Sequence, residues 1–420
     1  MSTATGPRYR QTLFQLRIYP IAIVLGLATG ALASAFIWAV FALKNALWQR
    51  QDWVYSHWLI FAICTTGGLL VGLLNHLSQA QQASAHDLEE VFEDVENIES
   101  KALPRASDVL RRAALGVTSL GFGGPLGPEA PLIEIASQMS ARMASVLRLA
   151  RFEAVQISVA GALGALFGAP LAIATDETIH VNGVRAKVQR LVRLGPELIA
   201  GFSAFIVFKQ LLPTSGLHTF ESTISQVTDL IGLSLFWIVA TSLLVGISIQ
   251  SLQKTIPTVR LMTVKYLPGG SIVAGLISGI VLGIGGMTNE MVLFSGHHEI
   301  QELLNSDHNW KFLLGILLLK VVVLIACLAG GWFGGQIFPM AFIGVSMALA
   351  VGDLTATANL LMLAGAGFVA AVTVGLKKPL LSLILGLLLF PQDVWLALIV
   401  ASAVATVFLH QSDIKPAQTH

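Results

Sequence analysis

Residues 121–131 place a carboxylate inside a segment rich in glycine and proline. Residues 121–126 (G-F-G-G-P-L) lead into residues 127–131 (G-P-E-A-P), and a helix-like apolar run follows over 132–149. Glycines and prolines break a helix that could otherwise continue. At membrane depth such broken backbone is tolerated only where protein buries it or where it lines a polar cavity. A carboxylate there costs at least ~2.5–3.5 kcal/mol at the bilayer centre, so Glu129 marks a candidate functional site.

The composition is that of an integral membrane protein. The chain has 420 residues, of which 55% are hydrophobic and only 12% are charged, whereas about 25% is usual for a soluble domain. Cys64 and Cys327 lie in apolar runs without a C-x-x-C pattern, which favours buried, reduced thiols over disulfides or a metal site.

Apolar segments recur along most of the chain, and no pattern of alternation indicates a β-barrel. Several are too short to cross a ~30 Å hydrocarbon core, which favours half-helices and re-entrant pieces. We therefore expect an all-α membrane protein. The segments lie at about 18–47, 57–77, 108–122, 129–149, 154–175, 194–212, 227–250, 270–286, 312–329, 337–352, 358–375, 379–391 and 394–410.

The charged connections predict the orientation in the membrane. The first apolar run is too long for a cleavable signal and follows several arginines, which favours a cytoplasmic N-terminus. The basic loops 185–193 and 254–265 are expected on the cytoplasmic side, and the acidic segment 289–310 outside. The acidic run at 87–99 is expected to be a solvated face.

An internal repeat relates the two halves of the chain. Residues 127–131 and 335–339 are both G-x-x-x-P, each follows a glycine pair, and each opens an apolar run. In both halves an A-G-A and then a P-L follow, at 160–171 and at 364–380. Paired broken helices in two repeats are typical of transporters with a site near the membrane midplane.

The broken helices predict an anion site. We expect helices after Pro131 and after Pro339, and a helix N-terminus presents free N–H groups and a partial positive charge. Two such ends could hold a small anion without a cationic side chain that would bind it too tightly for fast passage. Glu129 would then be either a gate, which competes with the anion when ionised and leaves when protonated, or a cap on the helix N-terminus.

In these motifs the chain resembles the CLC family of chloride channels and proton-coupled chloride transporters, as a divergent bacterial-type member. G-P-E-A-P is similar to the family's G-R-E-G-P and G-Q-I-F-P to its G-x-F-x-P, and the ordered motifs span roughly residues 18–416. The resemblance implies a homodimer with one anion pathway per subunit, built from two inverted repeats of tilted, broken helices. It makes Glu129 the gate and places the anion near Gly127, Pro128, Ala130, Gly335, Gln336, Ile337 and Phe338.

Other family positions match less well. The family's G-S-G-I-P motif is absent, which leaves Ser84 as the nearest anion-binding candidate, and Gln418 stands where the family has an anion-binding tyrosine. His180 falls at the position of the inner proton-transfer glutamate of the family's transporters, with Asp176 and Glu177 one turn earlier. A histidine can relay protons near neutral pH, although a simple loop position is the alternative.

A few further polar residues have simpler interpretations. Glu134 is expected to pair with Arg142 or to face a polar interior. Lys209 and Lys320 are expected to snorkel from helix ends. His297 and His298 lack a third ligand for a metal.

The sequence thus predicts transport of a small monovalent anion, chloride most simply, with fluoride or nitrate as alternatives. Whether it acts as a channel or as a proton-coupled antiporter stays open. A cation- or organic-anion-coupled transporter, a membrane-embedded enzyme and a transport-inactive scaffold are competing hypotheses. No H-E-x-x-H, G-x-S-x-G or paired intramembrane aspartates support an enzyme.

The expected organisation is a cytoplasmic segment 1–17, one membrane domain 18–410 with repeats at about 18–212 and 227–410, and a tail 411–420. We expect a multi-pass protein of the bacterial inner membrane, with lipid, the anion, protons and a second copy of the chain as partners. We expect no nucleic acid and no cofactor other than the bound anion.

Overall fold

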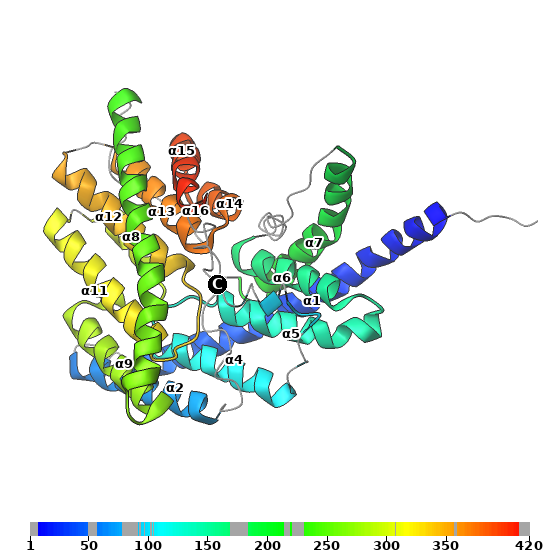
Figure 1. Ribbon diagram of the computed structural model, residues 1–420, viewed down its shortest axis with the longest axis horizontal. Helices are drawn as coiled ribbons and strands as arrows, with labels where there is room; N and C mark the ends of the chain where they lie inside the picture. The colour runs from blue at the N-terminus through cyan, green and yellow to red at the C-terminus, as the bar shows by residue number, and fades with distance from the viewer. Residues whose placement is uncertain are drawn as a thin grey trace, which may run out of the picture. The chain divides into compact units, whose positions relative to one another are not determined.

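The computed structural model describes most of the chain as helices. The described residues are 7–48, 57–77, 91, 94–95, 97–100, 103, 105–168, 184–213, 219–220, 231–306, 308–356 and 359–410. Figure 1 shows their course. The helices are α1 (Pro7–Trp48), α2 (His57–Leu77), α4 (Ala106–Gly121), α5 (Glu129–Leu147), α6 (Arg151–Phe167), α7 (Val184–Leu211), α8 (Ile231–Tyr266), α9 (Gly270–Thr288), η3 (Glu290–Val292), α10 (His297–Asn305), α11 (Trp310–Ala329), α12 (Ile337–Leu354), α13 (Leu360–Leu376), α14 (Pro379–Leu389), η4 (Gln392–Val394), α15 (Trp395–Ala405) and α16 (Val407–His410).

Eight helical stretches among the described residues are long and apolar enough to cross a membrane. They are Arg17–Trp48, His57–Leu77, Leu194–Leu211, Ser234–Tyr266, Gly270–Thr288, Trp310–Ala329, Ile337–Leu354 and Gln392–Leu409. Two further apolar helices, α13 and α14, have 17 and 11 residues, fewer than the ~20 that a full crossing needs. The predicted all-α membrane fold with shortened, broken helices is confirmed.

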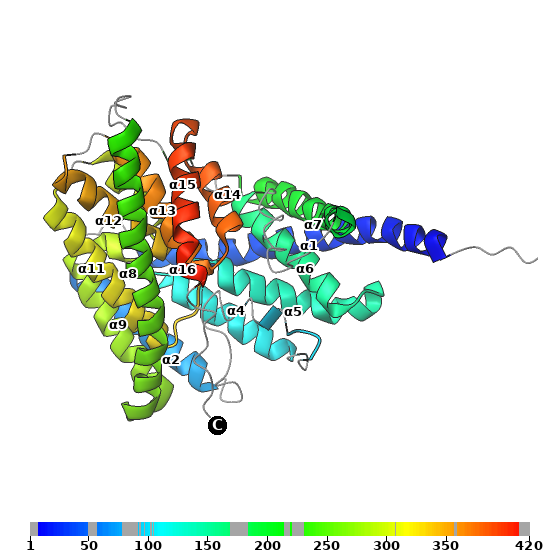
Figure 2. The ribbon, with the colours of Figure 1, turned by 45° about the horizontal axis from the view of Figure 1, so that its top comes forward.

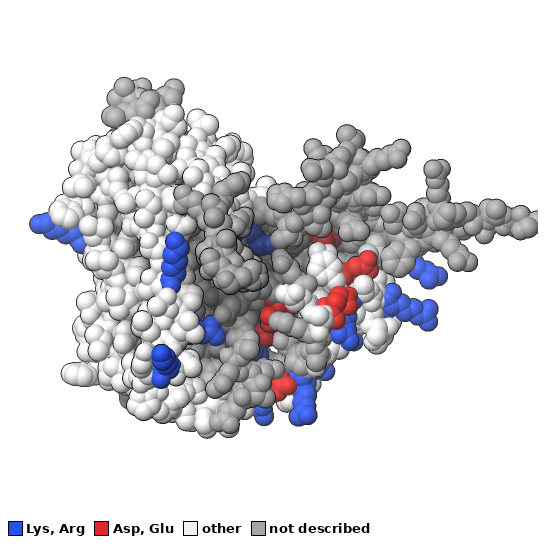
Figure 3. Space-filling view, viewed as in Figure 1, with Lys and Arg blue, Asp and Glu red and all other residues white. Residues whose placement is uncertain are grey.

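The surface agrees with this assignment. In Figure 3 the face that carries α8, α9 and α11 is largely uncharged, with only scattered lysine and arginine side chains. Large apolar side chains of α8 and α11 are exposed, for example Leu244, Ile247, Leu318 and Val322. Exposed apolar side chains on long apolar helices are what a lipid-facing surface requires.

The helices group into two compact units, which are described separately. The first comprises Met1–Trp38, Val91–Val109 and Leu132–Leu217, and the second comprises Ala39–Glu90, Leu110–Pro131 and His218–His420. The two predicted sequence repeats at about 18–212 and 227–410 stay a prediction.

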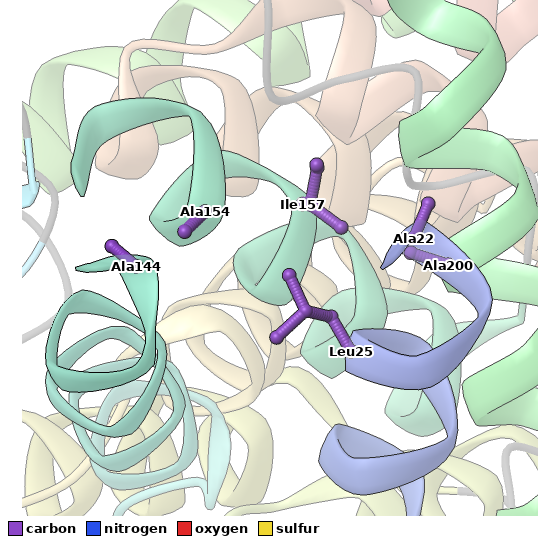
Figure 4. Close-up of a cluster of buried hydrophobic side chains, with 6 residues drawn as sticks. All are labelled: Ala22, Leu25, Ala144, Ala154, Ile157 and Ala200. Atoms are coloured by element: carbon purple, nitrogen blue, oxygen red, sulfur yellow. The ribbon is translucent and has the colours of Figure 1, made fainter. Parts of the chain in front are cut away.

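In the first unit, small side chains bring helices into close contact. Figure 4 shows a buried cluster in which Leu25 and Ile157 are surrounded by alanines; the six residues are Ala22, Leu25, Ala144, Ala154, Ile157 and Ala200. A methyl group added to Gly26 would lie 2.8 Å from the Cα of Ala200. Small residues of this kind allow membrane helices to pack backbone against backbone.

In the second unit, α12 and α13 form the interior. Every residue of α12 from Ile337 to Ala350 is buried, as is α13 from Leu363 to Leu376. Figures 1 and 2 show α8 running along this group, and it packs on α13, α11 and α15. A helix enclosed in this way contacts protein along its length, so its broken start can be stabilised by polar groups of the protein.

The helices α2 and α9 pack through glycines on both sides. A methyl group added to Gly279 would lie 2.6 Å from the carbonyl oxygen of Cys64, and one added to Gly72 would lie 2.7 Å from the Cα of Ile272. Cys64 and the second cysteine, Cys327, are both buried free thiols, as predicted.

Candidate functional site

Two glycine-rich turns carry the candidate site, and both belong to the second unit. The first glycine turn, residues 122–128, joins α4 to α5, and the second, residues 330–336, joins α11 to α12. The expectation that the helices start after Pro131 and Pro339 is wrong by a few residues, because α5 begins at Glu129 and α12 at Ile337. Each proline falls in the first helical turn, where its missing N–H has no intrahelical partner to lose.

The two turns are joined by a reciprocal pair of backbone hydrogen bonds. The N–H of Gly127 donates to the carbonyl oxygen of Gly335 at 2.8 Å, and the N–H of Gly335 donates to that of Gly127 at 2.7 Å. This pairing puts the turns in equivalent register, because Glu129 and Ile337 each follow the paired glycine by two residues and begin a helix. The helix N-termini that the sequence analysis expected to meet are therefore adjacent.

Buried polar contacts hold this junction. The hydroxyl of Ser119, near the end of α4, accepts a hydrogen bond from the N–H of Phe333 at 3.0 Å. The carbonyl oxygen of Ser119 accepts one from Gly124 at 3.0 Å. The fully buried Trp332 donates its indole N–H to the hydroxyl of Ser278 at 2.8 Å. Each bond satisfies a buried donor that would otherwise be costly to leave unpaired.

Glu129 lies inside this junction. Its exposure is 0%, and its Oε1 accepts a hydrogen bond from the N–H of Ile337 at 3.2 Å. Its Oε2 has no hydrogen-bond partner among the described residues. A carboxylate of the first helix thus occupies a free N–H at the start of the second helix, where the helix dipole favours a negative charge.

Glycine at both paired positions makes room for this carboxylate. A methyl group on Gly335 would overlap Cγ and Cδ of Glu129, and one on Gly127 would lie 2.6 Å from Oε1. The space between the paired glycines is therefore the carboxylate's seat, and neither position accepts a larger residue while the carboxylate is present.

The remaining predicted residues of the two motifs lie around this seat. Ala130, Ile337 and Phe338 are buried, Gln336 is 7% exposed and Pro128 is half-buried. The ring of Phe338 contacts that of His297, with a centroid distance of 4.9 Å. Three other candidates, Ser84, His180 and Gln418, lie outside the described residues, as do Asp176 and Glu177.

Sequence reasoning misjudged one charged residue. Lys320, expected to snorkel from a helix end, is fully buried, and its ammonium donates to backbone carbonyls, of which that of Phe294 is at 2.8 Å. That prediction is wrong; the central position of Lys320 in the run 312–329 was the available signal. Glu134 is 6% exposed and accepts a hydrogen bond from Gln138 at 2.8 Å, which agrees with the predicted polar interior position; the pair with Arg142 stays a prediction.

His297 and His298 start α10. Among the described residues no group of three or more histidine, cysteine, aspartate or glutamate side chains could hold a metal ion. The groups that meet at the candidate site are the carboxylate of Glu129, the N–H of Ile337 and the rings of Phe338 and His297.

Comparison with known proteins decides the family. The model of the family described as "Voltage gated chloride channel" matches residues 67–410. The chain belongs to the voltage-gated chloride channel family. The resemblance drawn from the two G-x-x-x-P motifs is thereby confirmed, and membership places the chain among anion-transporting membrane proteins. The members of this family are transporters or channels rather than enzymes.

Several bacterial relatives of the chain share one printed name. "Putative ion-transport protein YfeO" of Escherichia coli is 27% identical over 404 residues, which cover 91% of this chain and 87% of the relative. The protein of the same name from Shigella flexneri is 27% identical over 402 residues, covering 91% and 87%.

Solved structures share the fold of this family member. The structure of a slow cyanobacterial Cl-/H+ antiporter has a TM-score of 0.78 at 21% identity, over 95% of this chain and 96% of that one. A CLC-type fluoride/proton antiporter has a TM-score of 0.74 at 17% identity, over 93% and 94%. At this identity the likeness shows the fold alone.

Proposed function

We propose that the protein transports a small monovalent anion, chloride most simply, past the junction of the two glycine turns, and that Glu129 gates this pathway. The observation that carries the proposal is the position of the Glu129 carboxylate. It is fully buried, and it takes the N–H of Ile337 that a bound anion would use.

The gate follows from competition for one backbone donor. The ionised carboxylate of Glu129 and a free anion are both hydrogen-bond acceptors of negative charge, so they exclude each other at the N–H of Ile337. Protonation removes the charge of the carboxylate and weakens its hold on the helix N-terminus. The carboxylate can then leave, and the amides at Ile337 and Phe338 become the anion site.

The hydrogen-bond donors at this site would bind an anion weakly enough to release it, as transport requires. The anion would be held by backbone N–H groups and helix dipoles, with Gly127, Pro128, Ala130, Gly335 and Gln336 forming the walls. Such a site binds more weakly than a lysine or arginine clamp, and conduction requires that the ion also leaves.

Protons are part of the proposal because Glu129 must take one up in order to leave. A Cl-/H+ antiporter and a fluoride/proton antiporter share the fold, which supports proton coupling and makes fluoride the first alternative substrate. His180 for inner proton transfer, and Ser84 and Gln418 as anion ligands, stay proposals. A homodimer in the bacterial inner membrane, with a cytoplasmic N-terminus, completes the proposal.

The test is anion flux from liposomes that contain the purified protein, with protein-free liposomes as the control. Vesicles loaded with chloride are diluted into low-chloride buffer, and chloride efflux and vesicle pH are recorded together. We expect chloride efflux that drives protons in the opposite direction. Efflux without proton movement would establish a channel and overturn the coupling. No efflux of chloride, fluoride or nitrate would overturn anion transport and favour a scaffold role.

A further inference from the structure

The buried lysine Lys320 contacts a backbone segment, and neither the lysine nor this segment has a role in the proposed function. Lys320 lies midway along α11 and is fully buried. Its ammonium lies within hydrogen-bond distance of four successive carbonyl oxygens, which share its three N–H donors: those of Met291 at 3.4 Å, Val292 at 3.0 Å, Leu293 at 3.2 Å and Phe294 at 2.8 Å. A buried ammonium is tolerated only where hydrogen-bond acceptors replace its water. Residues 290–297, named the strap below, provide them.

The strap contacts the first glycine turn through Phe294. The N–H of Phe294 donates to the carbonyl oxygen of Gly123 at 3.0 Å. The ring of Phe294 lies under the ammonium of Lys44, at 3.9 Å, and meets the edge of Trp48, at 5.2 Å between centroids. Trp48 itself donates to the carbonyl oxygen of Gly121 at 2.9 Å. Phe294 has a φ of 53°, a conformation that a bulky residue keeps only when its surroundings enforce it.

The other end of the strap contacts the start of α12. The ring of His297 lies on that of Phe338, the residue after Ile337, at 4.9 Å. A methyl group on Gly296 would lie 3.0 Å from Cβ of Phe342. The ammonium of Lys320 is 5.0 Å from the centroid of the Phe342 ring. The strap therefore touches both structures that form the seat of Glu129, and Lys320 holds its middle.

We propose that Lys320 is a positioning residue for the anion site: by fixing the strap against Gly123 and against Phe338, it fixes the direction of the Ile337 N–H. The inference rests on the proposed function. Without the ammonium, the carbonyl oxygens of the strap, of which those of Val292 and Leu293 lie in buried contacts, lose this donor, and the strap must shift to satisfy them. The two glycine turns then lose a shared contact, and an anion at Ile337 is held less well.

The experiment is calorimetric titration of the purified protein in detergent with sodium chloride. We compare wild type with Lys320→Met, which keeps the length of the side chain and removes its donors. The matched control is Lys311→Met, on the exposed face of the same helix. We expect the Kd for chloride to rise about tenfold in Lys320→Met, with the number of sites per chain unchanged, and to stay within about twofold in the control.

The number of chloride sites per chain distinguishes a positioning role of Lys320 from a role in folding alone. If Lys320 served only to keep the protein folded, Lys320→Met would reduce the number of sites and leave the Kd of the remaining ones unchanged, which would overturn the proposal. Lys320→Gln separates donors from charge, because its shorter amide keeps two N–H donors. Positioning predicts a Kd between those of wild type and Lys320→Met, whereas a Kd as high as that of Lys320→Met would assign the effect to charge alone.

Two further variants complete the series. If both Lys320 variants fail to fold, Lys44→Met tests the position of the strap instead, because it removes the contact between the ammonium of Lys44 and the ring of Phe294. An unchanged Kd for chloride in Lys44→Met would overturn the proposal. Glu129→Gln, titrated alongside, removes the competing carboxylate and lowers the Kd if the proposed gate is correct. An unchanged Kd in Glu129→Gln with a raised Kd in Lys320→Met would count against the gate and support the positioning role.

Discussion

The first and second glycine turns share the positions of their key glycines and prolines but differ at the residue that begins the helix. Gly123 and Gly331 both have a positive φ, at 90° and 85°. Each is followed at the same spacing by the paired glycine, by the first helical residue and by a proline in the first helical turn. The first helical residue is Glu129 in one turn and Ile337 in the other.

Each turn also accepts a hydrogen bond from a residue outside it, at the equivalent glycine. The carbonyl oxygen of Gly123 accepts a hydrogen bond from the N–H of Phe294 at 3.0 Å, and that of Gly331 accepts one from the side-chain amide of Asn75 at 2.8 Å. The comparison shows a division of roles within a repeated design: the first turn provides the carboxylate and the second provides the N–H that receives it.

The largest effect is expected when the shared seat is filled. Gly335→Ala adds a methyl group where Cγ and Cδ of Glu129 lie. The carboxylate and the two turns must then move apart, and we expect chloride flux in liposomes to fall roughly a hundredfold. Gly127→Ala, which crowds both carboxylate oxygens of Glu129, and Oε2 most closely, should have a similar effect.

Gly315→Ala is the matched control for both glycine variants, because a methyl group at that position would meet no part of the described structure within 4 Å beyond its chain neighbours and the backbone of α11 itself. Normal flux in Gly335→Ala would show that Glu129 does not use this seat during transport.

An intermediate effect is expected at the contact that ties the turns together. Ser119→Ala leaves the buried N–H of Phe333 without an acceptor, which should destabilise the protein by about 1–3 kcal/mol. Ser242→Ala is the control, because among the described residues the buried hydroxyl of Ser242 donates within its own helix, to the carbonyl oxygen of Ile238 at 2.7 Å. Thermal unfolding in detergent measures both; equal melting temperatures would contradict the role of Ser119.

The smallest effect is expected at the two equivalent prolines. Pro131→Ala and Pro339→Ala keep the helix starts, and each should destabilise by about 0.4–1 kcal/mol, through the greater freedom of the unfolded chain. The comparison predicts the same change in melting temperature for both. A much larger loss at one of them would show that the two turns are not supported equivalently.

The two G-x-x-x-P motifs and Glu129 could be predicted from the sequence, whereas the contacts that residues far apart in the chain make with them could not. Glycine, proline and glutamate within a few residues indicate a broken helix with a carboxylate, which located Glu129 and the matching segment 335–339. The helix starts were misplaced because a proline in the first helical turn breaks no hydrogen bond and so gives no boundary.

Contacts between distant residues leave no local pattern. Ser119 and its partner Phe333 are separated by 214 positions, and a serine in an apolar helix looks the same whether or not it has such a partner. Lys320 and the strap are separated by 26–29 positions. The central position of Lys320 in the apolar run argues against snorkelling, but only the fold shows which carbonyl oxygens receive its ammonium.

The central claim, that Glu129 gates an anion pathway, is tested most directly by the pH dependence of chloride flux in Glu129→Gln. The neutral amide imitates the protonated carboxylate, whereas the wild-type carboxylate must take up a proton to leave. Wild-type flux should therefore rise as pH falls, and flux through Glu129→Gln should be independent of pH and uncoupled from protons. The control is Glu134→Gln, a buried glutamate on the same helix, which should keep the wild-type pH response. Unchanged flux and an unchanged pH response in Glu129→Gln would contradict the account.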